Sequence, residues 1–147
     1  MARKGKAEAA EARLHMIKLS VGTESVADLR AWHAERWKRE KRLYHRTRMH
    51  PKREEELLAG GSIFWVIRGL VLCRQRLVGF ERVRDEEGQP ATLLLLDRTL
   101  VEVEPTPHRA FQGWRYLEPA RAPRDLAAGE GDLPAELAAE LRQLGAW

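Results

Sequence analysis

The chain has 147 residues, of which 44% are hydrophobic and 33% are charged, and its net charge is +4 at neutral pH. This length suffices for one domain with a hydrophobic core. No apolar stretch approaches the length of a membrane span, because Arg68 interrupts the best candidate. The single cysteine, Cys73, excludes an internal disulfide framework and fits a reducing compartment. These properties predict a cytoplasmic, single-domain protein that does not enter a membrane.

The two ends of the chain differ from its middle in composition. Residues 1–13 are basic and rich in alanine, lack both an apolar stripe and a secretory signal, and are expected to be a disordered tail. The predicted domain covers residues 14–147. Within it, residues 118–132 are rich in Pro, Ala and Gly and are expected to form a surface linker. This linker leads to a C-terminal helix at residues 133–144, where leucines repeat at helical spacing.

The first predicted elements are a strand at residues 14–20 and a helix at residues 25–42. Ser25 and Asp28 have the spacing of a capping box at the start of this helix. His33 lies in the apolar stripe of the helix, and we interpret it as a half-buried, hydrogen-bonded histidine rather than a catalytic one. A strand at residues 43–50 and a short helix from Pro51 to Gly60 follow.

Residues 60–83 form the longest apolar and β-branched stretch, and they predict two strands joined at residues 68–69. Residues 63–67 are apolar on both faces, which is typical of a strand that is covered on both sides. The second strand is predicted at Leu70–Arg84, with Arg74 and Arg76 on the same face. Because a buried arginine is costly without a counter-ion, each of them must meet a carboxylate or a bound anion.

Two more strands are predicted at residues 91–97 and 100–104, followed by a break at residues 105–107. Residues 108–117 are expected to return to the sheet. Three successive strands with short turns indicate an antiparallel meander. We therefore predict an α+β fold with a curled, mainly antiparallel sheet or a small β-barrel, a long N-terminal helix, a short helix and a C-terminal helix.

The sequence contains no complete catalytic motif, and its five histidines are too scattered to suggest a metal site. We expect no metal and no cofactor, and whether the protein is an enzyme stays open. Cys73 could be activated if Arg74 lowered its pKa, but a small buried hydrophobic residue is the preferred interpretation. Several acidic residues are better explained as partners of arginines than as acid–base catalysts; they are Glu81, Asp97, Glu102 and Glu104.

Positive charge is concentrated in one segment. Residues 35–53 contain nine Lys or Arg against two Glu, a net charge of +7, so the rest of the chain is acidic. Such a segment favours a polyanion partner, RNA or a nucleotide, with aromatic rings stacking on bases. The predicted phosphate-binding residues are Arg46, Arg48, Lys52, Arg53, Arg74, Arg76 and Arg115. The predicted stacking residues are Tyr44 and Trp114.

Four stretches of the sequence carry a resemblance to a known family. They are HMIKLSVGT (15–23), TRMHPKREEELLAGGSIFWVIRG (47–69), RQRLVG (74–79) and FQGWRYL (111–117). Together they span about residues 14–126 and resemble the alphaproteobacterial domain of unknown function 1489 family, which implies no activity. The stretch ELLAGGSIFWVIRG is weakly similar to PUA-like small barrels of the ASCH group, which would imply RNA or modified-nucleotide binding. The lysine of the ASCH pattern is missing after Gly61.

Two alternative functions stay open from the sequence. An enzyme acting on a small anionic substrate could clamp it with Arg74 and Arg76 and use Glu81 or His108 for acid–base chemistry. A protein-interaction domain could instead dock a partner through the helix predicted within residues 133–147. The ligand, the strand order and the oligomeric state are not fixed by the sequence.

Overall fold

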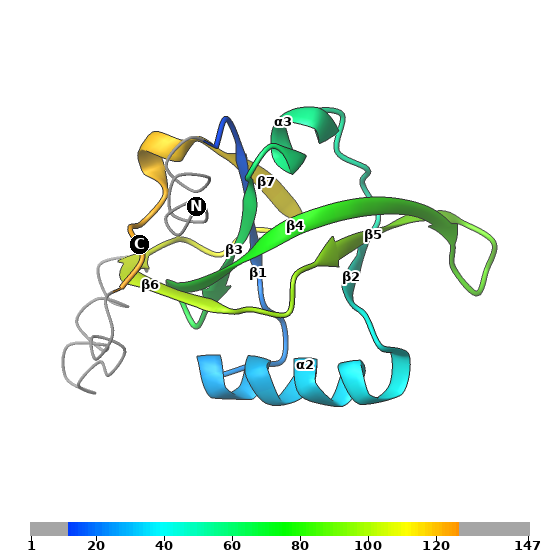
Figure 1. Ribbon diagram of the computed structural model, residues 1–147, viewed down its shortest axis with the longest axis horizontal. Coiled ribbons are helices and arrows are strands. Elements are labelled where there is room, and N and C mark those ends of the chain that lie inside the picture. Colours follow the sequence, from blue (N-terminus) through cyan, green and yellow to red (C-terminus); the bar gives the residue numbers. More distant parts are fainter. Residues whose placement is uncertain (1–11, 127–147) are drawn as a thin grey trace, which may run out of the picture.

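The structure is a computed structural model that describes residues 12–126. Seven strands form one mixed sheet, and the longer helix lies along one face of it (Figure 1). The strands are β1 (His15–Leu19), β2 (Leu43–Thr47), β3 (Ser62–Ile67), β4 (Leu70–Arg84), β5 (Pro90–Leu96), β6 (Val101–Pro107) and β7 (Trp114–Leu117). The helices are α2 (Val26–Glu40), α3 (Glu54–Leu58) and the 3-10 helix η1 (Pro119–Arg121).

The sheet is organised around β4, a strand of 15 residues. The first half of β4 pairs antiparallel with both β3 and β6, and its second half pairs antiparallel with β5. The strand order is β2-β5-β4-β3-β1-β7, with β6 on β4 outside this path. The first half of β4 therefore has a partner strand on each edge, and its second half belongs to the part of the sheet that contains β5.

A tight turn joins β3 to β4. Arg68 and Gly69 both have positive φ, at 49° and 81°. Positive φ at two successive residues is characteristic of the two-residue turns that suit the twist of a hairpin. The predicted bend at this dipeptide is confirmed, and so are the predicted bounds of the following strand, Leu70–Arg84.

Every residue of β3 is buried. Ile63, Trp65 and Ile67 belong to a core that also contains Leu29 of α2. Phe64 and Val66 belong to a second core on the opposite face, completed by residues of β1, β4 and β6 and by the segment before β7. The prediction that this strand is covered on both sides is confirmed.

The start of α2 follows the predicted capping box. The Ser25 hydroxyl accepts a hydrogen bond from the Asp28 amide at 3.1 Å, and the Asp28 carboxylate accepts one from the Glu24 amide at 2.9 Å. The helix buries Leu29 and His33 against the sheet. Because capping satisfies amides that have no partner inside the helix, the local sequence determines where α2 begins.

The predicted α+β fold class is wrong. The described chain is mostly β, with a seven-stranded mixed sheet and two α-helices of 15 and 5 residues. β1 and β3 run parallel, because α2, β2 and α3 return the chain in the same direction before β3 begins. No ladder of hydrogen bonds joins β2 to β7 within residues 12–126, so these strands do not close into a barrel. The predicted C-terminal helix lies outside the described residues.

The predicted break at residues 105–107 is also wrong, because β6 continues to Pro107. Proline is tolerated at this place because Pro107 is the last residue of its strand and Pro105 lies where the register with β4 shifts. Residues beyond β7, expected as a surface linker, also contact the sheet: the amide of Leu126 donates to the carbonyl of Glu102 at 2.9 Å. None of the helices within residues 12–126 is long and apolar enough to cross a membrane.

Candidate nucleic-acid interface

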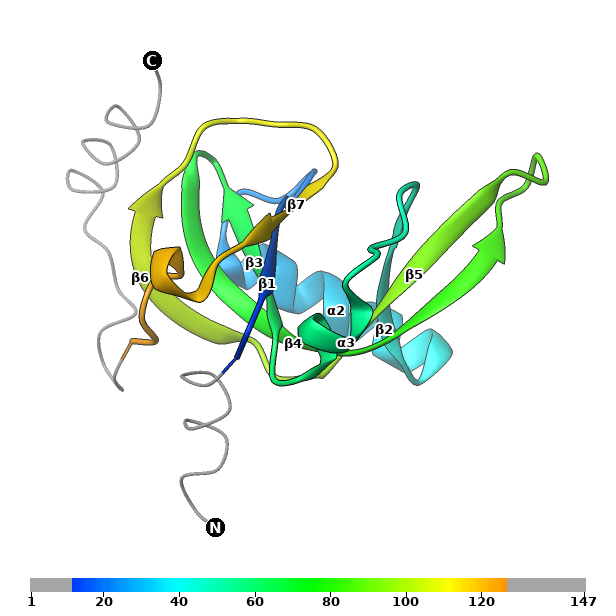
Figure 2. The ribbon, with the colours of Figure 1, turned by 90° about the horizontal axis from the view of Figure 1, so that it is seen from above.

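β2, β5 and residues 79–84 of β4 form a three-stranded part of the sheet that we call the arm. Figure 2 shows its β4–β5 end projecting away from β1, β3 and β7. Most of the predicted phosphate-binding residues of the basic segment lie on β2 or on the loop that follows it. The positive charge of residues 35–53 is therefore divided between α2, β2 and the loops on either side of β2.

The first hollow beside the arm has a volume of about 580 Å³ and lies between α2 and the arm strands. It is lined by Trp32, Arg36, Tyr44, His45, Arg46, Val83 and Leu93. Arg36 and Trp32 come from α2, four residues apart, so they lie on one side of the helix. The hollow thus combines two aromatic rings with two arginines, as predicted for a surface that binds RNA or a nucleotide, although Trp32 and Arg36 were not among the predicted residues.

Arg36 lies between two aromatic rings. Its Cζ is 4.3 Å from the centroid of the Trp32 ring and 4.3 Å from that of the Tyr44 ring. One of its amino groups, Nη1, donates to the Tyr44 carbonyl at 3.0 Å, while Nε is buried without a hydrogen-bond partner among the described residues. Trp32 is 39% exposed, an unusual amount for tryptophan in contact with a charged group. Stacking fixes the cation and leaves aromatic surface accessible at the same place.

A second hollow of about 500 Å³ lies next to the first, and the two share Val83 as a wall. Its lining is again basic, with Arg48, His50, Arg82 and Arg84 beside Val83, Pro90, Ala91 and Thr92. His50 Nδ1 lies 2.8 Å from the Thr92 hydroxyl, and this contact holds the loop after β2 against β5. The basic lining therefore extends from α2 to the hairpin between β4 and β5.

The arginines of the arm are paired with carboxylates near that hairpin. Arg46 lies 3.3 Å from Glu86, and Arg48 lies 3.2 Å from Asp85. Backbone amides of the hairpin turn lower the pKa of Asp85, chiefly that of Gln89, and Arg48 adds to this effect. Both arginine side chains are about half or more exposed, at 49% and 70%. Glu86 is also exposed, and an exposed pair such as Arg46–Glu86 contributes only about 0 to 1 kcal/mol, whereas the Asp85 side chain is 9% exposed. Both guanidinium groups are open to a further anion.

A histidine pair lies under α2. His33 Nε2 and His45 Nε2 are 3.3 Å apart, and His33 Nδ1 has no hydrogen-bond partner among the described residues. Burial lowers the pKa of His33 to about 4 and that of His45 to about 3, and the positive charge of Arg36 adds to both shifts. The prediction of a satisfied, half-buried His33 is confirmed only in part, because the residue is fully buried and its Nδ1 is unpaired within residues 12–126. No pattern in the sequence indicates His45 as its partner, because His45 comes from another element.

The remaining residues of the predicted site lie elsewhere. Arg53 makes two hydrogen bonds to Glu56, at 2.6 and 2.9 Å, and the amides of Lys52 and Arg53 donate to the Tyr116 hydroxyl. Trp114 is 8% exposed and donates to the carbonyl of Met49 at 2.8 Å. This second group surrounds the end of β7, whereas Tyr44, Arg46 and Arg48 surround the hollows of the arm.

The guanidinium group of Arg74 is hydrogen-bonded to side chains of the same protein. Its Nε and Nη2 donate to the Asp125 carboxylate at 2.8 and 2.7 Å, and its Nη1 donates to the Ser62 hydroxyl at 2.9 Å. Ser62 also donates its amide to His15 Nδ1 at 2.9 Å. The required anion is therefore a carboxylate from the segment that was expected to be a linker. The sequence could have suggested Asp125 only if the pairing of that segment with β6 had been foreseen.

Two other predicted arginines are exposed and lie away from the arm hollows. Arg76 is in β4, where its carbonyl accepts from the Asp97 amide, and Arg115 is in β7, with its Cζ 5.1 Å from the Phe111 ring centroid. Burial raises the pKa of Cys73 to about 12, so the idea that Arg74 activates this thiol is wrong. Within residues 12–126 no group of three or more His, Cys, Asp or Glu side chains could hold a metal ion.

The fold and these surfaces define a mostly β domain with a basic, aromatic-lined arm on its sheet. The family described as "Protein of unknown function (DUF1489)" matches residues 16–147, and the chain belongs to this family. No curated protein and no solved structure matches it. The family predicted from the sequence is thus confirmed, while the similarity to PUA-like barrels stays a prediction.

Proposed function

We propose that this protein binds single-stranded RNA in the cytoplasm, in the two hollows beside the arm. The observation that carries the proposal is the stack of Trp32, Arg36 and Tyr44 at the wall of the first hollow. Proteins that bind single strands combine a basic groove for the backbone with aromatic rings for the bases. The lone thiol of Cys73 is compatible with a reducing cytoplasm.

The base would stack at Trp32. Its ring is 39% exposed at the edge of a hollow of about 580 Å³, which has room for a nucleobase. Arg36 keeps the ring in place from one side, so little side-chain freedom is lost when a base arrives. This arrangement favours an unpaired strand, because a base inside a duplex has no free face to offer.

The phosphates would be held by Arg46 and Arg48, with Arg82 and Arg84 beside them in the second hollow. The carboxylates of Asp85 and Glu86 occupy the first two of these arginines in the free protein. Because the Arg46–Glu86 pair is exposed on both sides, a phosphate can replace its carboxylate at small cost, and the exposed Arg48 guanidinium can bind a phosphate beside Asp85. Lys52 and Arg53 lie further along the same loop, and we place them at the edge of the proposed surface.

The proposal is tested by fluorescence anisotropy with a labelled single-stranded RNA over a series of salt concentrations. The Arg46→Ala, Arg48→Ala double variant should bind about tenfold more weakly, because it removes two phosphate contacts. The slope of log K against log salt should fall by about 1.4, since each contact with a single strand contributes about 0.7. Arg121→Ala is the matched control, because Arg121 is exposed in η1, away from the arm.

A second variant separates stacking from charge. Trp32→Ala should weaken binding by about 1 to 3 kcal/mol, the usual contribution of one stacked base, and leave the salt slope unchanged. A wild-type protein that binds neither RNA nor single-stranded DNA at low salt would end the proposal. Equal loss of binding in Arg121→Ala and in the double variant would move the interface away from the arm.

A further inference from the structure

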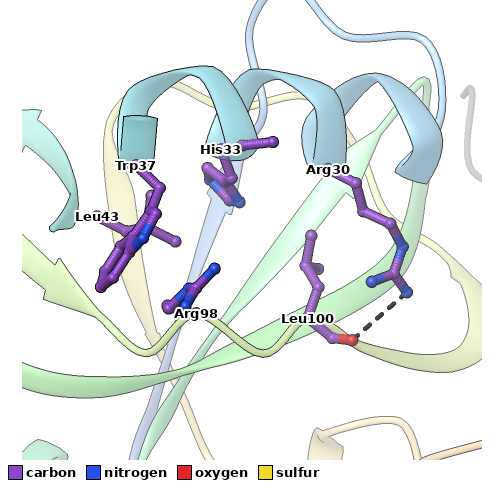
Figure 3. Close-up of a pocket in the computed structure, with 7 residues that line it drawn as sticks. Arg30, His33, Trp37, Leu43, Arg98 and Leu100 are labelled. Atoms are coloured by element: carbon purple, nitrogen blue, oxygen red, sulfur yellow. Dashed lines mark hydrogen bonds between the residues drawn. The ribbon is translucent and has the colours of Figure 1, made fainter. Parts of the chain in front are cut away.

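A pocket on the other side of α2 is separate from the two hollows, although Leu43 of β2 forms part of its wall. It has a volume of about 210 Å³, and we call it the α2 pocket. It is lined by Arg30, His33, Ala34, Trp37, Leu43, Arg98 and Leu100 (Figure 3). The four residues from α2 are at spacings of three and four, so they form one face of the helix. Trp32 and Arg36, which line the first hollow, lie on a different face.

Two arginines line the α2 pocket from different elements. The Cζ of Arg98 lies 4.0 Å from the centroid of the Trp37 ring, and this stacking is its contact among the described residues. Arg30 lies 3.6 Å from Glu102 and 3.5 Å from the Leu100 carbonyl, both at the long limit for a hydrogen bond. Both guanidinium groups therefore keep donors available, and neither is locked in a bidentate pair as Arg74 is.

The third polar group of the α2 pocket is His33. The side chains of His33 and Arg98 point toward the same space from opposite sides, as Figure 3 shows. His33 is only 5% exposed, and its Nδ1 has no hydrogen-bond partner among the described residues. A buried polar atom without a partner is costly in a folded protein, so a ligand that satisfies it gains affinity.

We propose that the α2 pocket binds a phosphate group, held by Arg30 and Arg98 and by the Nδ1–H of His33. Guanidinium groups recognise phosphate oxygens with paired N–H donors, and a stacked arginine such as Arg98 is already oriented to do so. The apolar walls, Leu43 and Leu100, are both buried and limit the water that competes for these donors.

The volume selects the size of the ligand. Pockets for drug-sized molecules measure about 300 to 1,000 Å³. At about 210 Å³ the α2 pocket is smaller than these, a size that suits a phosphate group better than a whole nucleotide. The source of the group is either free phosphate or the phosphate end of a larger molecule whose remainder stays outside.

Phosphate binding also dictates the tautomer of His33. The ring is neutral at pH 7, because burial holds its pKa at about 4. An anion needs a hydrogen on Nδ1, so Nε2 must then accept a hydrogen bond from His45, 3.3 Å away. Phosphate bound in the α2 pocket therefore fixes the tautomer of the His33 ring, whereas phosphate loosely associated with the surface does not.

The test uses the full chain, with isothermal titration calorimetry against inorganic phosphate and, separately, against adenosine 5′-monophosphate. We expect measurable binding at millimolar concentrations. Arg98→Ala and Arg30→Ala should each weaken it about tenfold or more, because each removes a charged donor to the anion. Lys38→Ala is the matched control: it removes one charge from the same helix, and Lys38 is exposed outside the α2 pocket. Binding of both ligands indicates a site for the phosphate itself, whereas binding of the nucleotide alone indicates an esterified phosphate.

Nitrogen-15 NMR of the histidine rings gives an independent readout that does not depend on variants that fold poorly. Saturation with phosphate should move His33 to the tautomer with hydrogen on Nδ1 and His45 to the one with hydrogen on Nε2. The proposal is overturned if neither ligand binds, or if binding survives in both arginine variants. It is also overturned if phosphate binds while the His33 resonances stay where they were. RNA binding on the arm is a separate property, which Arg98→Ala should leave unchanged.

Discussion

Arg74, in the first half of β4, and the arginines of the arm are in opposite situations. In the first half, between β3 and β6, Arg74 has a side chain only 12% exposed and gives three donors to Asp125 and Ser62. On the arm, the side chains of Arg46 and Arg48 are 49% and 70% exposed, and each touches one carboxylate. Arginine is therefore a structural residue at position 74 and an exposed charge on the arm.

The difference follows from what surrounds each half. The first half of β4 has strands on both edges and core residues on both faces, so any charge inside it must be neutralised for the chain to fold. The second half pairs with β5, and several of its side chains are exposed. Substitutions that change packing or charge should therefore be costly near β3 and cheap on the arm.

The largest effect is expected from Gly61→Ala, just before β3. A Cβ at this position would overlap the backbone carbonyl oxygens of Leu57 and Leu14, which cannot turn aside. We expect the free energy of unfolding to fall by about 3 kcal/mol or more, measured by urea denaturation followed by circular dichroism. The matched control is Gly79→Ala on the arm, where the new Cβ meets the flexible Leu95 side chain at 3.2 Å. Similar losses in the two variants would remove the contrast between the halves.

A smaller loss is expected when the partner of Arg74 is removed. Asp125→Ala leaves a mostly buried guanidinium without its anion, which should cost about 2 to 3 kcal/mol of unfolding free energy. Arg46→Ala on the arm should change stability by less than about 1 kcal/mol. Adding Arg74→Leu to the Asp125 variant should restore part of the loss, since the unpaired charge is then gone. Equal effects of Asp125→Ala and Arg46→Ala would contradict the assignment of Arg74 as structural.

Low pH should reduce the free energy of unfolding through His15, whose Nδ1 accepts a hydrogen bond from the Ser62 amide of β3. Burial lowers the pKa of His15 to about 4, from 6.5 in an unfolded chain, and the nearby Arg74 adds to the shift. The unfolded state then binds more protons between these values, so stability is complete above pH 6.5 and is lost as the pH falls toward 4. Each such histidine should cost on the order of 1 to 2 kcal/mol between pH 7 and pH 5.

The measurement compares urea unfolding of the wild type with that of His15→Gln at both pH values. Glutamine keeps an oxygen that can accept from the Ser62 amide, so the variant should fold. Its stability should fall less steeply with pH, although His33 and His45 continue to contribute. A pH dependence that is identical in the two proteins would show that His15 does not titrate as its burial requires.

Local patterns were sufficient for much of the fold. The capping box predicted the start of α2, and the two apolar faces of residues 63–67 predicted a strand covered on both sides. Leu70–Arg84 was predicted with its observed bounds, because the turn before it and the charged loop after it are both strong local signals. The basic residues Arg46 and Arg48 were also identified, since charge is read directly from the sequence.

Relations between distant segments were not predictable in the same way. The parallel pairing of β1 with β3 depends on three intervening elements, and it makes the sheet mixed. The predicted fold class is wrong because the described chain is mostly β. Asp125 was assigned to a linker because Pro, Ala and Gly are typical of loops, yet it reaches Arg74 across 51 positions of the chain. Trp32 and Arg36 were missed for a related reason: only the packing of α2 beside β2 brings them to Tyr44.

The hydrogen bond between His33 and His45 connects the α2 pocket with the first hollow. His45 lines the first hollow, and His33 lines the α2 pocket. With both rings neutral, one hydrogen lies between the two Nε2 atoms, so the tautomer of one ring sets that of the other. A ligand that accepts a hydrogen bond from Nδ1 of one histidine therefore fixes the tautomer of the other. In that tautomer, Nδ1 of the second histidine accepts a hydrogen bond instead of donating one. A ligand on one side of α2 can therefore change the hydrogen-bonding state of the histidine on the other side without any movement of the helix.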